Sequence, residues 1–333
     1  MIENNQQQKR NFYLEYQSNI EITLYQNNYV KIMEFNERSS ILVLGKTDGR
    51  FLKFQFKFGA LKFIQELYGS KTKSLHILLT KKSNQIIIVT KKILFFSLID
   101  NNRGYFLQYI DGPQPNCLLI NKNDSLLIAG SNDRAIRFWI KSQNQWIFHQ
   151  KFQICYYGVI ISLSLNESEN YLICLSELEN KIFICKKNHL TNTWFLYQIL
   201  HSRESQALQL CFIKDSIFIL QLLKGENFNF YNLNLENQYF EQITPEIQDQ
   251  QCNKLKFPHR FNLQMIKQRQ FLIYKKDNCI NLLLIQSEKS FEFQKIMTLS
   301  DSSFIFRSTE DGKYIVIAQE NQKFLTVSRL SEG

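Results

Sequence analysis

Short apolar runs of four to seven residues recur along the whole chain, and clusters of Asn, Asp, Lys and Ser separate them. Many of these runs alternate apolar with polar residues, a pattern that predicts β-strands. Almost no window shows the apolar spacing of three to four residues that an amphipathic helix requires. The hydrophobic pattern therefore predicts an all-β protein.

The most apolar run recurs at a nearly constant interval, which predicts an internal repeat. The steps between neighbouring runs are 40 to 54 residues long. The runs begin at Ile41, Ile86, Leu126, Tyr171, Ile217, Phe271 and Tyr314. A period of about 40 to 45 residues with about four short strands in each period is typical of the blades of a β-propeller. We therefore expect seven blades.

The third repeat carries the most specific motif. Residues 126–139 read Leu-Leu-Ile-Ala-Gly-Ser-Asn-Asp-Arg-Ala-Ile-Arg-Phe-Trp, and this segment resembles the second strand, tight turn and third strand of a WD40 repeat. The resemblance implies a seven-bladed WD40-type β-propeller. It also implies that Asp133 accepts hydrogen bonds in a buried network that reaches Trp139, with Ser131 as a further structural member of the motif.

The last repeat offers only three strands, so its outer strand must come from elsewhere. An alternating segment at residues 20–25 precedes the first complete repeat. The resemblance implies that this N-terminal segment closes the ring and so covers an open sheet edge. We expect one propeller domain over residues 12–330 and a disordered polar tail over residues 1–11. The longest step leaves extra sequence at residues 245–261, which we expect to form a long loop.

Composition narrows the class of protein. The N-terminal ten residues are polar, and the most apolar stretch is interrupted by two lysines, so we expect neither a secretory signal nor a membrane span. We expect a cytoplasmic protein, and a nuclear location stays open. The seven cysteines are scattered without a C-x-x-C pair, which predicts buried thiols rather than disulfides or metal ligands.

Sequence motifs for catalysis are absent. The chain contains no nucleophile elbow, zinc-protease motif, dinucleotide fingerprint or phosphate-binding loop. The five histidines lie in different repeats, and none has the spacing of a metal site. We therefore expect a non-catalytic protein without a catalytic residue, a metal or a cofactor.

Partner binding is the function that the resemblance implies. In WD40 proteins, the loop from the fourth strand to the next blade and the loop between the second and third strands form the rim most often used for binding. In this chain, the candidate partner-binding residues in those loops are Lys91, Lys92, Arg134, Tyr156, Tyr157 and Arg203. Because the rim is mixed in charge but positive, we expect a monomeric propeller that holds an acidic protein or peptide within a multiprotein complex.

Two alternatives stay open. Trp146 and Trp194 each enter an outer strand, and this feature is similar to one in the cytosolic iron-sulphur protein assembly adaptor, which is also a seven-bladed WD40 protein. The net charge of +10 favours an RNA-associated subunit instead, although the lysines are dispersed along the chain.

Overall fold

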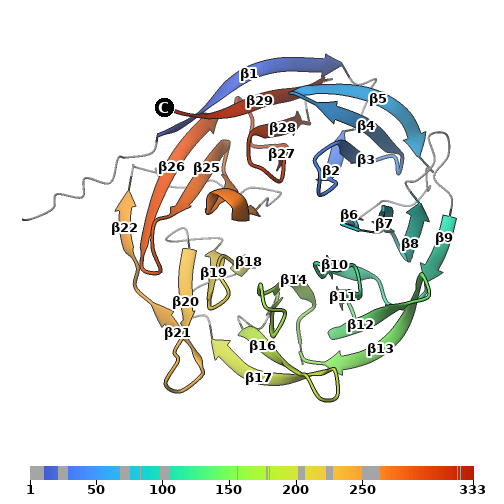
Figure 1. The fold of residues 1–333 in the computed structure, drawn as a ribbon, viewed down its shortest axis with the longest axis vertical. Helices are drawn as coiled ribbons and strands as arrows, with labels where there is room; N and C mark the ends of the chain where they lie inside the picture. The colour runs from blue at the N-terminus through green and yellow to red at the C-terminus, as the bar shows by residue number, and fades with distance from the viewer. Residues whose placement is uncertain are drawn as a thin grey trace, which may run out of the picture.

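The computed structural model is a ring of seven β-sheets around a common centre (Figure 1). It describes residues 11–21, 29–67, 76–82, 84–97, 106–155, 157–177, 179, 181–201, 207–222, 228–249, 263–320, 322 and 324–333. The expected all-β, seven-bladed propeller closed by an N-terminal strand is confirmed. Six blades have four strands and one has five.

The four strands of each blade are labelled a to d in order from the centre of the ring to its outer edge. Blades 1 to 4 are β2 (Val30–Phe35), β3 (Ile41–Lys46), β4 (Phe51–Lys57) and β5 (Ala60–Leu67); β6 (His76–Leu79), β7 (Gln85–Val89), β8 (Ile93–Ser97) and β9 (Phe106–Ile110); β10 (Pro115–Ile120), β11 (Leu126–Ser131), β12 (Ala135–Ser142) and β13 (Gln145–Gln153); β14 (Ile160–Leu165), β15 (Tyr171–Ser176), β16 (Lys181–Asn188) and β17 (Thr193–His201).

The other three blades follow the same order, with one addition. Blades 5 to 7 are β18 (Ala207–Phe212), β19 (Ile217–Leu222), β20 (Phe228–Leu233) and β21 (Phe240–Ile243); β23 (Leu263–Ile266), β24 (Phe271–Lys276), β25 (Cys279–Ile285) and β26 (Ser290–Thr298), with β22 (Glu246–Asp249) outside them; β27 (Phe304–Ser308), β28 (Tyr314–Gln319), β29 (Phe324–Glu332) and β1 (Phe12–Glu21). One short 3-10 turn, η1 (Lys267–Arg269), follows β23. Within the described ranges, no helix has the length and apolar character needed to cross a membrane.

The second strand of each blade is the most apolar because both of its faces are covered. All six residues of β11, β15 and β19 are buried. Outer strands such as β13 are instead exposed or half-buried along most of their length, and Trp146 is the one buried residue of β13. Six of the seven expected runs begin at the first residue of a second strand, and the run at Ile86 begins one residue into β7.

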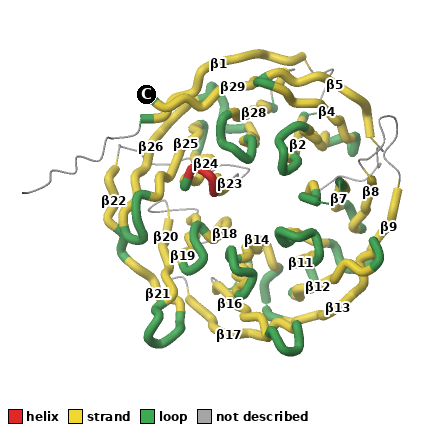
Figure 2. The backbone as a smooth tube through the Cα atoms, in the orientation of Figure 1, coloured by secondary structure: helices red, strands yellow, loops and turns green. Residues whose placement is uncertain are grey.

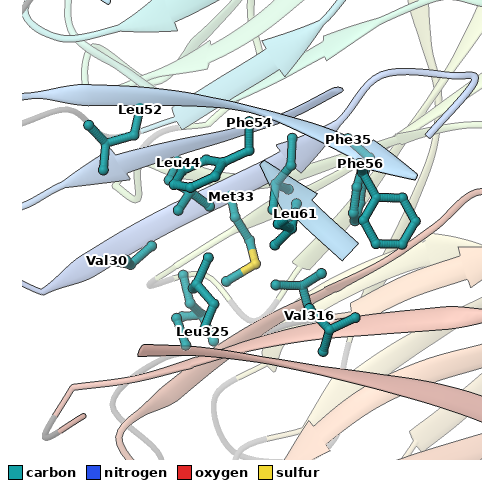
Figure 3. Close-up of a cluster of buried hydrophobic side chains, with 14 residues drawn as sticks. Val30, Met33, Phe35, Leu44, Leu52, Phe54, Phe56, Leu61, Val316 and Leu325 are labelled. Atoms are coloured by element: carbon teal, nitrogen blue, oxygen red, sulfur yellow. The ribbon is translucent and has the colours of Figure 1, made fainter. Parts of the chain in front are cut away.

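Among the described residues, the hydrophobic core forms seven clusters, and each cluster lies between two neighbouring blades. Figure 3 shows the cluster between blades 1 and 7, where Met33 and Phe54 of blade 1 face Val316 and Leu325 of blade 7. A single blade therefore buries little apolar surface alone, and the ring gains its hydrophobic stabilisation from stacking.

The ring is closed by β1, which pairs antiparallel with β29 from Phe12 opposite Glu332 to Glu21 opposite Phe324. This strand lies nearer the N-terminus than the expected segment at residues 20–25, of which positions 22–25 lie outside the described residues. The reason is that Phe12 and Leu14 pack into the cluster between blades 6 and 7. The backbone carbonyl of Asn11 also accepts a hydrogen bond of 2.8 Å from Gly333, so ordered pairing begins one residue inside the expected tail.

The insertion at residues 245–261 is not entirely a loop, so that expectation is wrong at its start. Strand β22 pairs in parallel with β26 and adds a fifth strand to blade 6. The added strand covers the outer edge of that blade, and an open edge is a general hazard for β-sheets. Residues 250–261 lie outside the described residues.

Candidate functional site

The antiparallel order of each blade places its loops on two rims. The b–c loops and the connections from strand d to the next blade form one rim, which we call the b–c rim. The a–b and c–d loops form the opposite one, the a–b rim. Figure 2 shows the described loops in green between the strands around the ring. Of the candidate partner-binding residues, Lys91, Lys92, Arg134 and Tyr157 lie on the b–c rim.

Arg134 and Tyr157 belong to two loops that a backbone hydrogen bond joins at the b–c rim end of blade 3. Arg134 ends the b–c turn with a positive φ of 67°, and its carbonyl accepts a hydrogen bond of 3.4 Å from the backbone of Ile154, three residues before Tyr157. Tyr157 is 80% exposed, and its backbone N–H donates to Glu179 at 2.8 Å. The structure therefore brings an exposed aromatic ring and an arginine to one sector of the b–c rim. Tyr156 and Arg203 lie outside the described residues.

Lys91 and Lys92 lie in the b–c turn of blade 2 and line a small cleft toward blade 3. Lys92 pairs with Asp111 at 2.7 Å, and its ammonium group lies 4.5 Å from the centre of the Tyr109 ring. The cleft has a volume of about 10 Å³, which is room for a single water molecule. This sector can bind a partner's surface but not an enclosed small molecule.

Asp133 is held by neighbours other than those that the WD40 resemblance implies. Both carboxylate oxygens accept hydrogen bonds from the guanidinium group of Arg137, and Lys151 lies 3.7 Å away. The hydrogen bond from Arg137 holds the pKa of Asp133 below its usual value. Arg137 precedes Trp139 by two positions on β12, so the two share a face of the strand and Arg137 lies on the side nearer Asp133.

Trp139 and Ser131 are both buried in this fold. Trp139 is 5% exposed and packs in the cluster between blades 2 and 3. Ser131 is buried, and its carbonyl accepts a hydrogen bond of 3.1 Å from Arg134 that closes the tight turn. The described contacts of Asp133 do not extend to Trp139.

Several other b–c turns also pair their charges. Asp48 binds Arg50 at 2.6 Å in blade 1, and Glu179 binds Lys181 at 3.3 Å in blade 4. These pairs offset part of the positive charge that the sequence places on this rim. The b–c rim is therefore less basic than the net charge of +10 indicates.

Four cysteines gather in the core between blades 3 and 4, namely Cys117, Cys155, Cys174 and Cys185. All four are buried free thiols, as expected. Burial raises the pKa of Cys117 to about 12 and that of Cys155 to about 11, so the thiolate forms that react and bind metals are suppressed. Among the described residues, no group of three or more His, Cys, Asp or Glu side chains is arranged to hold a metal ion.

The outer-strand tryptophans belong to a repeated contact that the sequence analysis missed. The side-chain amide of Gln150 donates to the carbonyl of Trp194 at 2.7 Å and accepts from its N–H at 2.9 Å. Gln108 binds Trp146 in the same way, and Gln198 binds Phe240. We call this contact the glutamine clasp. Its sequence signal is a Gln four positions after each outer-strand Trp.

The same tryptophans fill the core between blades. Trp194 stacks on Phe138 of the preceding blade with ring centres 5.7 Å apart, and Trp146 stacks on Phe95 at 5.9 Å. Both indoles are buried. The two outer-strand tryptophans therefore have a packing role in this fold.

A second repeated device shapes the a–b loops. Asn36, Asn121 and Asn166 each accept two backbone N–H groups from the end of their own loop, at 2.8 to 2.9 Å. Thr80 and Thr309 do the same with one N–H each. Each of these residues stands five positions before the first residue of the second strand, a spacing that could have been found in the sequence.

Comparison with known proteins does not place the chain in a family. No family model matches the sequence, and no curated protein matches it either. The seven-bladed propeller and its rims are therefore the basis for the functional argument.

Proposed function

We propose that this chain is a non-catalytic scaffold of the WD40 type that binds a protein or peptide partner at the b–c rim within a multiprotein complex. The observation that carries the proposal is the sector of the b–c rim at blade 3, which holds both Arg134 and the exposed ring of Tyr157. Aromatic and Arg side chains dominate the binding energy of protein interfaces. The small volume of the neighbouring cleft favours a surface partner over a small molecule.

An acidic partner suits this rim. Arg134 and Lys91 are exposed, and charge complementarity would raise the association rate and select the partner. Asp133 and Asp111 each already contact a basic residue, so the acidic groups of this sector are largely occupied.

Affinity purification of the full chain, followed by mass spectrometry, tests the proposal. The double variant Arg134→Ala and Tyr157→Ala should release the main partner by about 2 kcal/mol, or roughly thirtyfold in affinity. The matched control is Arg38→Ala with Phe58→Ala, an exposed arginine and an exposed aromatic residue on the a–b rim of blade 1. Equal partner capture by both double variants would contradict the assignment to the b–c rim.

An RNA-associated subunit is the second candidate, and the net charge of +10 favours it. Binding through phosphate contacts weakens steeply as salt rises, because counterions are released on binding. Capture of RNA that is lost between low and physiological salt would support this candidate, whereas salt-tolerant capture of a protein supports the scaffold.

A further inference from the structure

The a–b rim carries a series of contacts between neighbouring blades. The carboxylates of Asp124, Glu169 and Asp215 each reach back from their own a–b loop to the a–b loop of the preceding blade. Their backbone partners are the N–H groups of Lys81 and Lys82 for Asp124, of Lys122 for Glu169 and of Ser168 for Asp215. Blades 2 to 5 are thus joined by one carboxylate at each step.

This series stops at blade 6. Its a–b loop, Lys267-Gln-Arg-Gln270, contains no acidic residue and forms the 3-10 turn η1. No side chain caps the start of that turn. Blade 5 also departs from the pattern, because its a–b loop is one residue shorter and Ile213 makes the backbone hydrogen bond to the first residue of the second strand that Asn121 and Asn166 make in blades 3 and 4. The a–b loop of blade 5 therefore faces basic residues in place of a carboxylate.

A cavity of about 330 Å³ lies at this break, between the a–b loops of blades 4, 5 and 6. Its apolar wall includes Leu165, Phe212, Met265 and Ile285. A volume near 300 Å³ is at the lower end of ligand-binding pockets and holds one or two large side chains.

The charged lining of the cavity consists of two acidic residues and two lysines. Glu167 pairs with Lys122 at 3.0 Å, and the Asp215 carboxylate accepts the N–H of Ser168 at 2.7 Å. In contrast, Lys214 and Lys267 have no carboxylate within 4.0 Å among the residues that the structure describes. Both ammonium groups therefore lie beside an apolar wall without a direct ion pair among the described residues, and the charge of Lys267 also helps to lower the pKa of Glu167.

We propose that this cavity binds an acidic segment of a partner polypeptide, with its carboxylate at Lys214 and Lys267 and a neighbouring apolar side chain against Met265 and Ile285. The ligand would supply the carboxylate that blade 6 lacks. This site lies on the rim opposite the proposed partner site, so it is a second docking point and does not depend on the first.

The chain's own loops indicate the form of such a ligand. Asp124, Glu169 and Asp215 are each followed two positions later by an apolar residue that enters the core, namely Leu126, Tyr171 and Ile217. A ligand with an acidic residue, then a polar and then an apolar residue would therefore match both the lysines and the apolar wall of the cavity.

Methyl NMR on the full chain, labelled with ¹³C at its methionine methyl groups, tests this site. The probe is a capped peptide with the sequence of residues 122–126, and its matched control carries Asn in place of the aspartate. The acidic peptide should shift the Met265 resonance in a saturable way, while the buried Met33 resonance between blades 1 and 7 stays in place. The Asn peptide should bind about two- to fivefold more weakly, the factor expected for one partly exposed ion pair.

Variants of the lysines provide a second measurement. Lys214→Gln and Lys267→Gln should each weaken the acidic peptide roughly fivefold. Lys289→Gln, an exposed lysine of the c–d turn of blade 6 on the same rim but outside the cavity, should leave binding unchanged.

Three outcomes would overturn the proposal. They are no shift of the Met265 resonance with the acidic peptide, equal affinities for the acidic and Asn peptides, and a loss of affinity with Lys289→Gln as large as that with Lys214→Gln or Lys267→Gln. Hexanoate serves as a third probe. Binding of hexanoate without binding of the peptide would assign the cavity to a small organic acid, which also contradicts a polypeptide ligand. None of these measurements involves Arg134 or Tyr157, so failure here leaves the scaffold proposal standing.

Discussion

Replacing Phe12 with Ala should open the ring at its closing strand. Phe12 is 6% exposed and packs edge to face on Phe271 of blade 6, with ring centres 5.5 Å apart. Its carbonyl also accepts a hydrogen bond of 3.3 Å from Gln294. Truncating a buried Phe to Ala costs about 3 to 5 kcal/mol. For a chain of 333 residues, the unfolding entropy converts that cost into a fall in Tm of roughly 4 to 7 °C.

The matched control for this variant is Tyr13→Ala. Tyr13 follows Phe12 on β1 but points to the other face and is 46% exposed, so its truncation should lower the Tm by about 1 °C or less. Thermal unfolding followed by circular dichroism measures both variants. Equal falls in Tm for the two variants would show that the face of β1 against blade 6 does not hold the ring closed.

Two further predictions concern contacts within the ring. Gln150→Ala removes both hydrogen bonds of one glutamine clasp and leaves the partly buried backbone of Trp194 without partners, so we expect a loss of about 2 kcal/mol in denaturant unfolding. The control is Gln153→Ala, because the Gln153 amide makes one exposed hydrogen bond of 3.4 Å. This variant should lower the free energy of unfolding by less than about 0.5 kcal/mol. A larger loss for Gln153→Ala than for Gln150→Ala would refute the stabilising role of the clasp. Burial raises the pKa of Glu34 to about 7, although Arg307 pairs with it. The folded state therefore holds a proton that the unfolded state releases near pH 4.5. The free energy of unfolding should fall as pH rises from about 4.5 to about 7, by up to about 3 kcal/mol. Glu34→Gln should lack this fall in a series of melting curves against pH, and an unchanged pH profile would show that Glu34 does not cause it.

The repeat could be predicted because one strand of each blade is covered on both faces. Leu126, Tyr171 and Ile217 each begin such a strand, and each follows a polar loop, so the apolar run has a sharp start. Divergence of the motif residues did not obscure this pattern, because burial between blades requires only apolar side chains of suitable size.

The bounds of the closing strand could not be predicted as easily. A bulge between Tyr16 and Ser18 shifts the register of β1 against β29, so the alternation of apolar residues changes face within the strand. Strand β22 also gave no local signal, because its partner β26 begins at Ser290 and the pairing is parallel.

Site residues were predictable as loop positions but not as contacts. The sequence placed Arg134 and Lys92 in b–c turns, yet the partners of Asp133 depended on Arg137, a residue that the WD40 resemblance did not single out. The carboxylate contacts on the a–b rim join residues 42 to 47 positions apart in neighbouring blades. Such contacts follow from the stacking of blades, and a pattern within one repeat does not contain them.

The pairing of β1 with β29 also sets an order of events during biosynthesis. Phe12 leaves the ribosome first and must wait for Glu332, its partner in the strand pair, which at ordinary elongation rates takes roughly 15 to 60 s. Until then, the apolar sides of blades 1 and 6 that later contact blade 7 have no covering sheet. The growing chain therefore exposes two apolar surfaces to chaperones and proteases until the strands of blade 7 emerge, and a ribosome that stalls within those strands would hold an open ring.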